Sequence, residues 1–83
     1  MEIFWLHDDQ RSAYSSVDSL GRAFFGLAEE IEKWLADHKI LWSYLDESGY
    51  LIDDYGSPVE YREITHLIIE DSEDAVLYKL TWM

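Results

Sequence analysis

The chain has 83 residues, and 18 acidic against six basic side chains give it a formal charge of −12. Apolar residues make up 48% of it and aromatic residues 16%, which excludes a disordered acidic tail, because such tails lack the side chains needed to fold. The charge also disfavours direct binding to nucleic acid or to an anionic membrane, since both would repel the chain. We therefore expect one domain, residues 1–83, that presents a negative surface to a positively charged protein.

The chain contains no cysteine, so neither disulfides nor thiolate–metal sites can stabilise it. Residues 1–9 lack the features of a signal peptide, and no apolar run approaches the ~20 residues of a membrane helix. We expect a cytoplasmic protein, in the host cytoplasm if a phage encodes it, with no membrane association. A monomer is expected over a homo-oligomer.

The first half of the chain predicts a strand and a helix. Met1–His7 is apolar on both sides of an extended segment, which indicates a strand covered on both faces or shared with a partner. Helical spacing then predicts a helix over about 17–38, capped by Ser15 or Ser16. Phe25 falls outside the apolar stripe of that helix, so it is a second contact with the fold or an exposed contact residue. The stripe consists of Leu20, Phe24, Leu27, Ile31, Trp34, Leu35 and His38.

The second half predicts strands only. They are Ile40–Asp46 and Tyr50–Asp53 around a turn at 47–49, then, after a connection at 55–58, Ile64–Glu70 and Ala75–Met83 around a turn at 71–74. The predicted fold class is α+β, in the order β-α-β-β-β-β. One long helix packs on a largely antiparallel sheet.

Acidic residues gather at the predicted strand ends and turns. One interpretation is ordinary turn chemistry, since Asp favours turns. The other is a display of carboxylates that imitates a nucleic-acid backbone and gives fast, salt-sensitive association with a basic protein. The residues concerned are Asp8, Asp9, Asp46, Glu47, Asp53, Asp54, Glu70, Asp71, Glu73 and Asp74.

Signals for catalysis and for metal binding are weak. The acidic turns lack the spacing and central glycine of an EF-hand, and the three histidines fit no metal-ligand motif. We therefore expect no metal, no cofactor and no enzymatic activity. The aromatic residues exceed what one helix–sheet interface readily covers, which predicts partial exposure of Phe25, Tyr44, Tyr50, Tyr61, Tyr78 and Trp82.

Several short pieces, in the same order, give the chain a resemblance to the phage-encoded uracil-DNA glycosylase inhibitors. They are Ile40-Leu41, Asp46-Glu47-Ser48, Pro58 with Glu60-Tyr61, and residues 67–72, while residues 2–9 look like a shortened first strand with its acids. The resemblance implies that the first strand enters the DNA groove of the glycosylase, with Glu2, Asp8 and Asp9 as phosphate mimics. It also implies a pocket for an apolar loop residue of the enzyme, lined by Leu20, Phe24, Leu27, Ile31, Leu51 and Leu67.

Charge and resemblance together predict an acidic DNA-mimic inhibitor of a DNA-binding enzyme, with uracil-DNA glycosylase as the first candidate. Other phage inhibitors, directed against CRISPR or restriction systems, are an alternative with the same charge logic. An immunity protein against a basic nuclease toxin is another, and a homo-oligomeric structural protein is a third.

Overall fold

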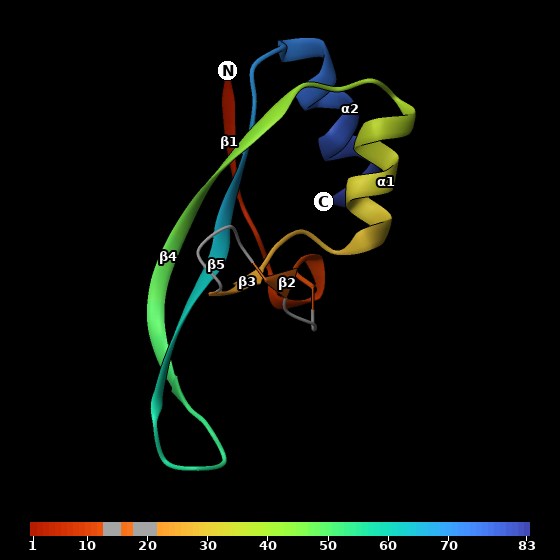
Figure 1. Cartoon of the computed structure of the whole chain (residues 1–83). Coiled ribbons are helices and arrows are strands. Elements are labelled where there is room, and N and C mark those ends of the chain that lie inside the picture. The colour runs from red at the N-terminus through yellow and green to blue at the C-terminus, as the bar shows by residue number, and fades with distance from the viewer. Residues whose placement is uncertain (13–15, 18–21) are drawn as a thin grey trace.

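The computed structural model describes residues 1–12, 16–17 and 22–83, which form a single small domain of mixed α and β structure (Figure 1). The described residues contain two α-helices, a short 3₁₀ helix and a sheet of five strands. The α+β class is therefore confirmed. No helix in this part of the chain is both long and apolar enough to cross a membrane.

The sheet is organised around its longest strand, β5. β4 pairs antiparallel with β5 along its whole length, on one edge. The other edge of β5 is shared, because β1 pairs antiparallel with its C-terminal part and β3 pairs parallel with its N-terminal part. β2 adds to β3. The strands are β1 (Glu2–Trp5), β2 (Ser16–Val17), β3 (Ala23–Phe25), β4 (Trp42–Ile52) and β5 (Pro58–Ile69).

Both α-helices, α1 (Glu29–Asp37) and α2 (Ser72–Trp82), lie on the same side of the sheet (Figure 1). One turn apart, Ile31 and Leu35 give α1 its buried side. The hydrophobic core fills the space between helices and sheet and consists of Phe4, Leu6, Leu27, Ile31, Leu35, Ile40, Ile64, Leu67, Ile69, Ala75 and Tyr78.

The 3₁₀ helix η1 (Asp8–Gln10) connects the first strand to this core. Gln10 is buried although it is polar. Its side-chain oxygen accepts a hydrogen bond from the His7 backbone N–H at 3.0 Å, and its Nε2 donates to the Trp82 carbonyl at 3.3 Å. Gln10 therefore ties the N-terminal segment to the last turn of α2.

The prediction of one long helix over 17–38 was wrong, because, of the described residues in that range, only Glu29–Asp37 is helical. Within the described residues, Ala23–Phe25 instead forms a strand beside β5. The spacing of Phe24 and Leu27 suits a helix, but two consecutive aromatic residues also suit a strand, and pairing with β5 decides between the two. Residues 18–21 of the predicted helix lie outside the described part, as does the proposed cap Ser15.

The prediction of a final strand over Ala75–Met83 was also wrong, since these residues belong to α2 and its end. The segment 71–74 is the start of a helix rather than a turn, because the Asp71 carboxylate accepts hydrogen bonds from the N–H groups of Glu73 and Asp74. The predicted break at 47–49 is absent from β4, and the observed order is β-β-β-α-β-β-α.

Candidate interaction surface

One face of the sheet carries none of the helices found in residues 1–12, 16–17 and 22–83, and we call it the outer face. Cross-strand register aligns Ile3 with Ile68, and Trp5 with His66 and Leu45. Directly opposite residues share a face, and alternation places these five on the side away from Phe4, Leu67 and the core. Ile3, Trp5 and Leu45 are 49%, 60% and 46% exposed. The first strand is therefore covered on one face only, and an apolar patch of three strands is open to solvent.

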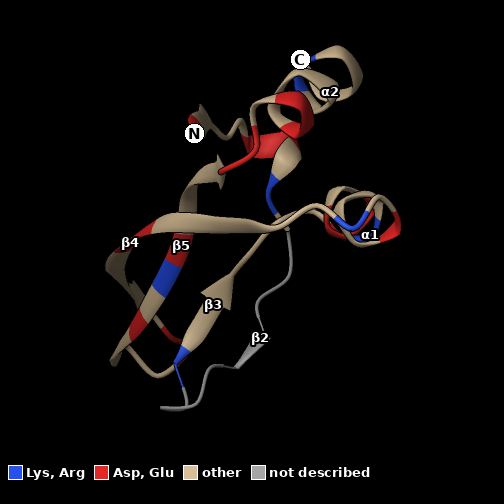
Figure 2. Cartoon of the chain, turned by 90° about the horizontal axis from the view of Figure 1, so that it is seen from above, with Lys and Arg blue, Asp and Glu red and all other residues tan. Residues whose placement is uncertain are grey.

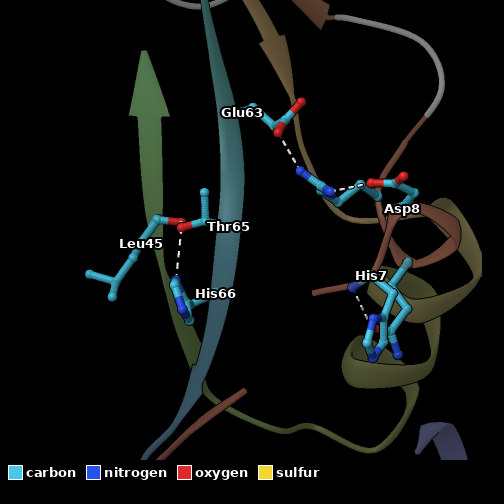
Figure 3. Close-up of polar contacts among 8 residues, drawn as sticks. His7, Asp8, Leu45, Glu63, Thr65 and His66 are labelled. Carbon is cyan, nitrogen blue, oxygen red and sulfur yellow. Dashed lines mark hydrogen bonds and ion pairs between the residues drawn. The ribbon is translucent and has the colours of Figure 1, made fainter. Parts of the chain in front are cut away.

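An ordered polar contact underlies this patch. β5 has a register shift where Leu45 pairs with His66 and Asp46 pairs with Ile64, which leaves Thr65 as the extra residue of a bulge. The Thr65 hydroxyl donates to the Leu45 carbonyl at 3.2 Å and lies 2.8 Å from Nδ1 of His66 (Figure 3). The His66 ring, with Trp5 edge-on at 4.7 Å, is thereby fixed in place.

The β4–β5 hairpin extends well beyond the helices (Figure 1). Asp53 holds its turn, because the carboxylate accepts from the N–H groups of Tyr55 and Ser57 at 2.9 and 2.8 Å. Gly56 follows with φ +80°, a conformation that favours glycine. Near this turn the hairpin exposes apolar side chains on both strands: Tyr50, Leu51, Ile52, Tyr55 and Val59.

Most of the basic side chains form ion pairs with carboxylates of the same chain. Arg11 pairs with both Asp8 and Glu63 (Figure 3), and three further pairs link Arg22 to Glu60, Arg62 to Asp46 and Lys79 to Glu2. All three arginines and one of three lysines are thus engaged with carboxylates. Most of the other acids that the structure describes are exposed, among them Asp9, Glu47, Asp54, Glu70 and Glu73.

The predicted acidic residues do not form one cluster. Asp53 and Asp54 lie at the hairpin turn, Glu70 to Asp74 lie around the start of α2, and Asp8 and Asp9 lie on η1 between them (Figure 1). Figure 2 shows further acids on α1 and on the strands. Five of the eleven predicted positions have clear structural contacts: Asp53 in the turn, Asp71 at the cap, and Glu2, Asp8 and Asp46 in ion pairs.

The apolar residues that the resemblance assigns to a pocket are separated by the fold. Leu27, Ile31 and Leu67 are core residues with 4% exposure or less. Phe24 lies on β3 with its ring 5.7 Å from that of Tyr44, and Leu51 is exposed on the hairpin. Leu20 lies outside the described residues.

Exposure of the predicted aromatic residues is mixed. Tyr44 and Tyr50 are exposed, and Phe25, Tyr61 and Trp82 are half-buried. Phe25 packs edge-on against Tyr61 with the ring centres 5.9 Å apart. The prediction for Tyr78 was wrong, because its side chain is fully buried.

Sequence reasoning missed Trp5 and Tyr55 as exposed aromatics. Trp5 alternates with the buried Phe4 and Leu6, so a strand with one open face would have indicated its exposure.

The described residues offer no candidate metal site. They include no group of three or more His, Cys, Asp or Glu side chains able to hold a metal. Burial raises the pKa of Tyr78, whose hydroxyl finds no hydrogen-bond partner in the described part of the chain. A surface depression on α1 is lined by Glu29, Glu32, Lys33 and Ala36. The prominent features are thus exposed acids and exposed apolar strands.

No family model, curated protein or solved structure matches this chain.

Proposed function

We propose that the protein is an acidic inhibitor that occupies the DNA-binding groove of an enzyme, with uracil-DNA glycosylase as the first target to test. The observation that carries the proposal is that the arginines form ion pairs within the chain. Arg11, Arg22 and Arg62 all pair with carboxylates of the same chain, which leaves the rest of the acidic surface without a basic counterpart from them. A protein that needed only solubility would require a net charge of about 2–8 in magnitude, well below −12.

The exposed acids are spread over a length that suits such a groove. The molecule is 47 Å long, which matches the axial length of about 14 base pairs. Asp54 lies at the hairpin end, Glu70 and Glu73 lie at the other, and Asp9 lies between (Figure 1). Carboxylates at both ends of the molecule favour fast association with an extended positive surface.

The proposal depends on charge and not on the apolar pocket implied by the resemblance. Leu27, Ile31 and Leu67 are fixed in the core, so these side chains are not open to a loop of the enzyme. Glu2, a phosphate mimic by resemblance, is held by Lys79 at 2.8 Å. Asp9, at the surface of η1, is the better placed of the N-terminal acids.

Inhibition of purified glycosylase, measured over a range of salt concentrations, tests the proposal. Inhibition at micromolar concentration that weakens as salt rises is expected; its absence excludes this enzyme, and a pull-down from lysate then tests the wider class. The triple variant Asp9→Asn, Asp54→Asn, Glu73→Gln should inhibit much less. The matched control is Glu2→Gln, Asp46→Asn, Glu60→Gln, which reaches the same net charge of −9 (−12 + 3) by removing internally paired acids. Equal losses in the two variants would contradict a role for the positions of the exposed acids.

A further inference from the structure

The outer edge of β4 is an unpaired strand edge. Among the described residues, β4 pairs only with β5, so a row of backbone groups along Trp42–Ile52 faces solvent. The backbone N–H of Asp53 donates to the carbonyl of Ser57 at 3.0 Å. Asp53 and Ser57 therefore occupy a hydrogen-bonded position of the antiparallel ladder. Because such pairs alternate along an antiparallel ladder, the N–H groups of Ser48, Tyr50 and Ile52 point toward the free edge.

Apart from the acidic residues Asp46 and Glu47 near its centre, this edge lacks the features with which proteins usually protect a strand. Edge strands are commonly short or interrupted by lysine, proline or a bulge that turns them away. β4 has 11 residues, contains neither lysine nor proline, and its register shift places the extra residue on β5. Apolar side chains in and directly before it are exposed on both faces: Leu41, Tyr44, Leu45, Tyr50, Leu51 and Ile52. An added strand would cover these side chains and pair the open backbone groups.

The charge at the centre of β4 indicates what kind of strand would fit. Glu47 lies directly opposite Glu63 on β5, and Glu63 is already paired with Arg11. Like charges directly opposite one another are unfavourable, and in the described part of the chain Glu47 has no ion pair. A lysine or arginine placed opposite Glu47 on the free side would relieve this.

A second copy of the chain fits less well. Antiparallel self-pairing over the full length of β4 would place Glu47 opposite Glu47 of the other copy, because residue 47 is the midpoint of 42–52. It would also bring two charges of −12 together. Both effects oppose association of identical chains.

We propose that β4 binds an extended segment of another protein by strand addition. The segment carries lysine or arginine opposite Glu47 and apolar residues opposite Leu45 and Gly49. Tyr61 supplies the apolar surface at Gly49, since its ring lies close enough that a Cβ there would be 2.8 Å from it. This mode of binding is independent of the proposed inhibition of a DNA-binding enzyme.

A synthetic peptide of the length of β4 provides the test. Its central sequence is Leu-Thr-Lys-Thr-Leu. Because this sequence is the same in both directions, the peptide can add to β4 in a parallel or an antiparallel orientation. We expect a Kd of about 1 mM or tighter, with the largest NMR shifts in the amides of Trp42–Ile52. The Glu47→Lys variant should weaken binding roughly fivefold or more, and replacing the peptide's Lys by Glu should restore it.

Two controls separate strand addition from other attachment. Asp54→Lys changes charge equally but lies at the hairpin turn, and it should leave the affinity nearly unchanged. A peptide with methylated backbone nitrogens on the edge that faces β4 should not bind. Absence of saturable binding, equal binding of the methylated peptide, or shifts outside β4 and its neighbours would overturn the proposal. A dimer of the free protein at physiological salt, with Trp42–Ile52 protected from hydrogen exchange, would overturn it in favour of a second copy.

Discussion

The buried hydroxyl of Tyr78 predicts that a single oxygen atom can be removed from the core with a gain in stability. The Tyr78 side chain is fully buried, with its ring centre 4.7 Å from that of Phe4 and 6.2 Å from that of Trp34. Its hydroxyl has no hydrogen-bond partner among the described residues. Burying an unsatisfied hydroxyl costs about 1–3 kcal/mol, whereas the ring contacts persist in Tyr78→Phe. We expect this variant to be about 1 kcal/mol more stable at pH 7, which raises Tm by about 4–8 °C in a domain of this size.

The stability difference between Tyr78→Phe and the parent protein should also depend on pH. Burial raises the pKa of Tyr78 above 10.0, so the folded state favours the protonated, neutral phenol. The stability that the folded protein gains from keeping this phenol neutral is fully present below pH 10.0. It is lost as the pH rises through the pKa of Tyr78 in the folded state. The stability gap between Tyr78→Phe and the parent should therefore widen above pH 10, by at most about 1.4 kcal/mol per pH unit.

Urea unfolding at pH 7 and at pH 10.5 measures both effects. Tyr55→Phe is the matched control, because Tyr55 is 93% exposed and its hydroxyl reaches solvent; it should change stability by less than about 0.5 kcal/mol at either pH. A Tyr78→Phe variant that is less stable than the parent at pH 7 would refute the reasoning. So would a stability gap that stays constant between the two pH values.

Two further substitutions test the contacts that define α2 and the hairpin. Asp71→Ala removes the acceptor of the N–H groups of Glu73 and Asp74, and it should cost about 0.5–2 kcal/mol in thermal unfolding. Asp71→Asn keeps an acceptor and should cost less; an equal cost would contradict the cap. Gly49→Ala places a methyl group 2.8 Å from the Tyr61 ring and should cost about 1–3 kcal/mol. In a Tyr61→Ala background the same substitution should be nearly neutral, and a double-mutant cycle without coupling would contradict the contact.

The sequence contained enough information for some elements and not for others. Ile31 and Leu35 share one side of α1, and that part of the predicted helix is confirmed. α2 escaped prediction because it is apolar on two sides: Ala75 and Tyr78 face the core, while Leu80 is exposed. No single apolar stripe marks such a helix.

Pairing partners account for the remaining errors in the fold. Phe24 and Phe25 are compatible with a helix and with a strand, and the parallel contact with β5 that decides between them lies 38 residues away (Ala23↔Tyr61). Local periodicity carries no information on such a contact. The single open side of the sheet was likewise hidden, because Met1–His7 is apolar on both sides whether or not a partner covers the second one.

The candidate surface was predictable in its charge and less so in its shape. The acids at 53–54 lie at a turn, whereas those at 71–74, expected in a turn, lie at the start of a helix. Which of them have internal contacts depends on distant residues, as the pair of Arg11 with Glu63 shows. Spacing alone could not reveal that three of the residues assigned to a pocket belong to the core.

The charge and the open strand edge are connected, which gives a last prediction. A long apolar edge invites pairing with identical molecules, and the net charge of −12 together with Glu47 at the centre of β4 opposes this. Glu47→Val removes the central charge and adds a β-branched side chain that favours strands. We expect sedimentation velocity to detect self-association of this variant at concentrations where the parent is monomeric. Asp54→Val, with the same change in charge and apolar area at the hairpin turn, should stay monomeric. If both variants associate equally, exposed apolar area alone would explain the result, and if neither does, Glu47 does not protect the edge.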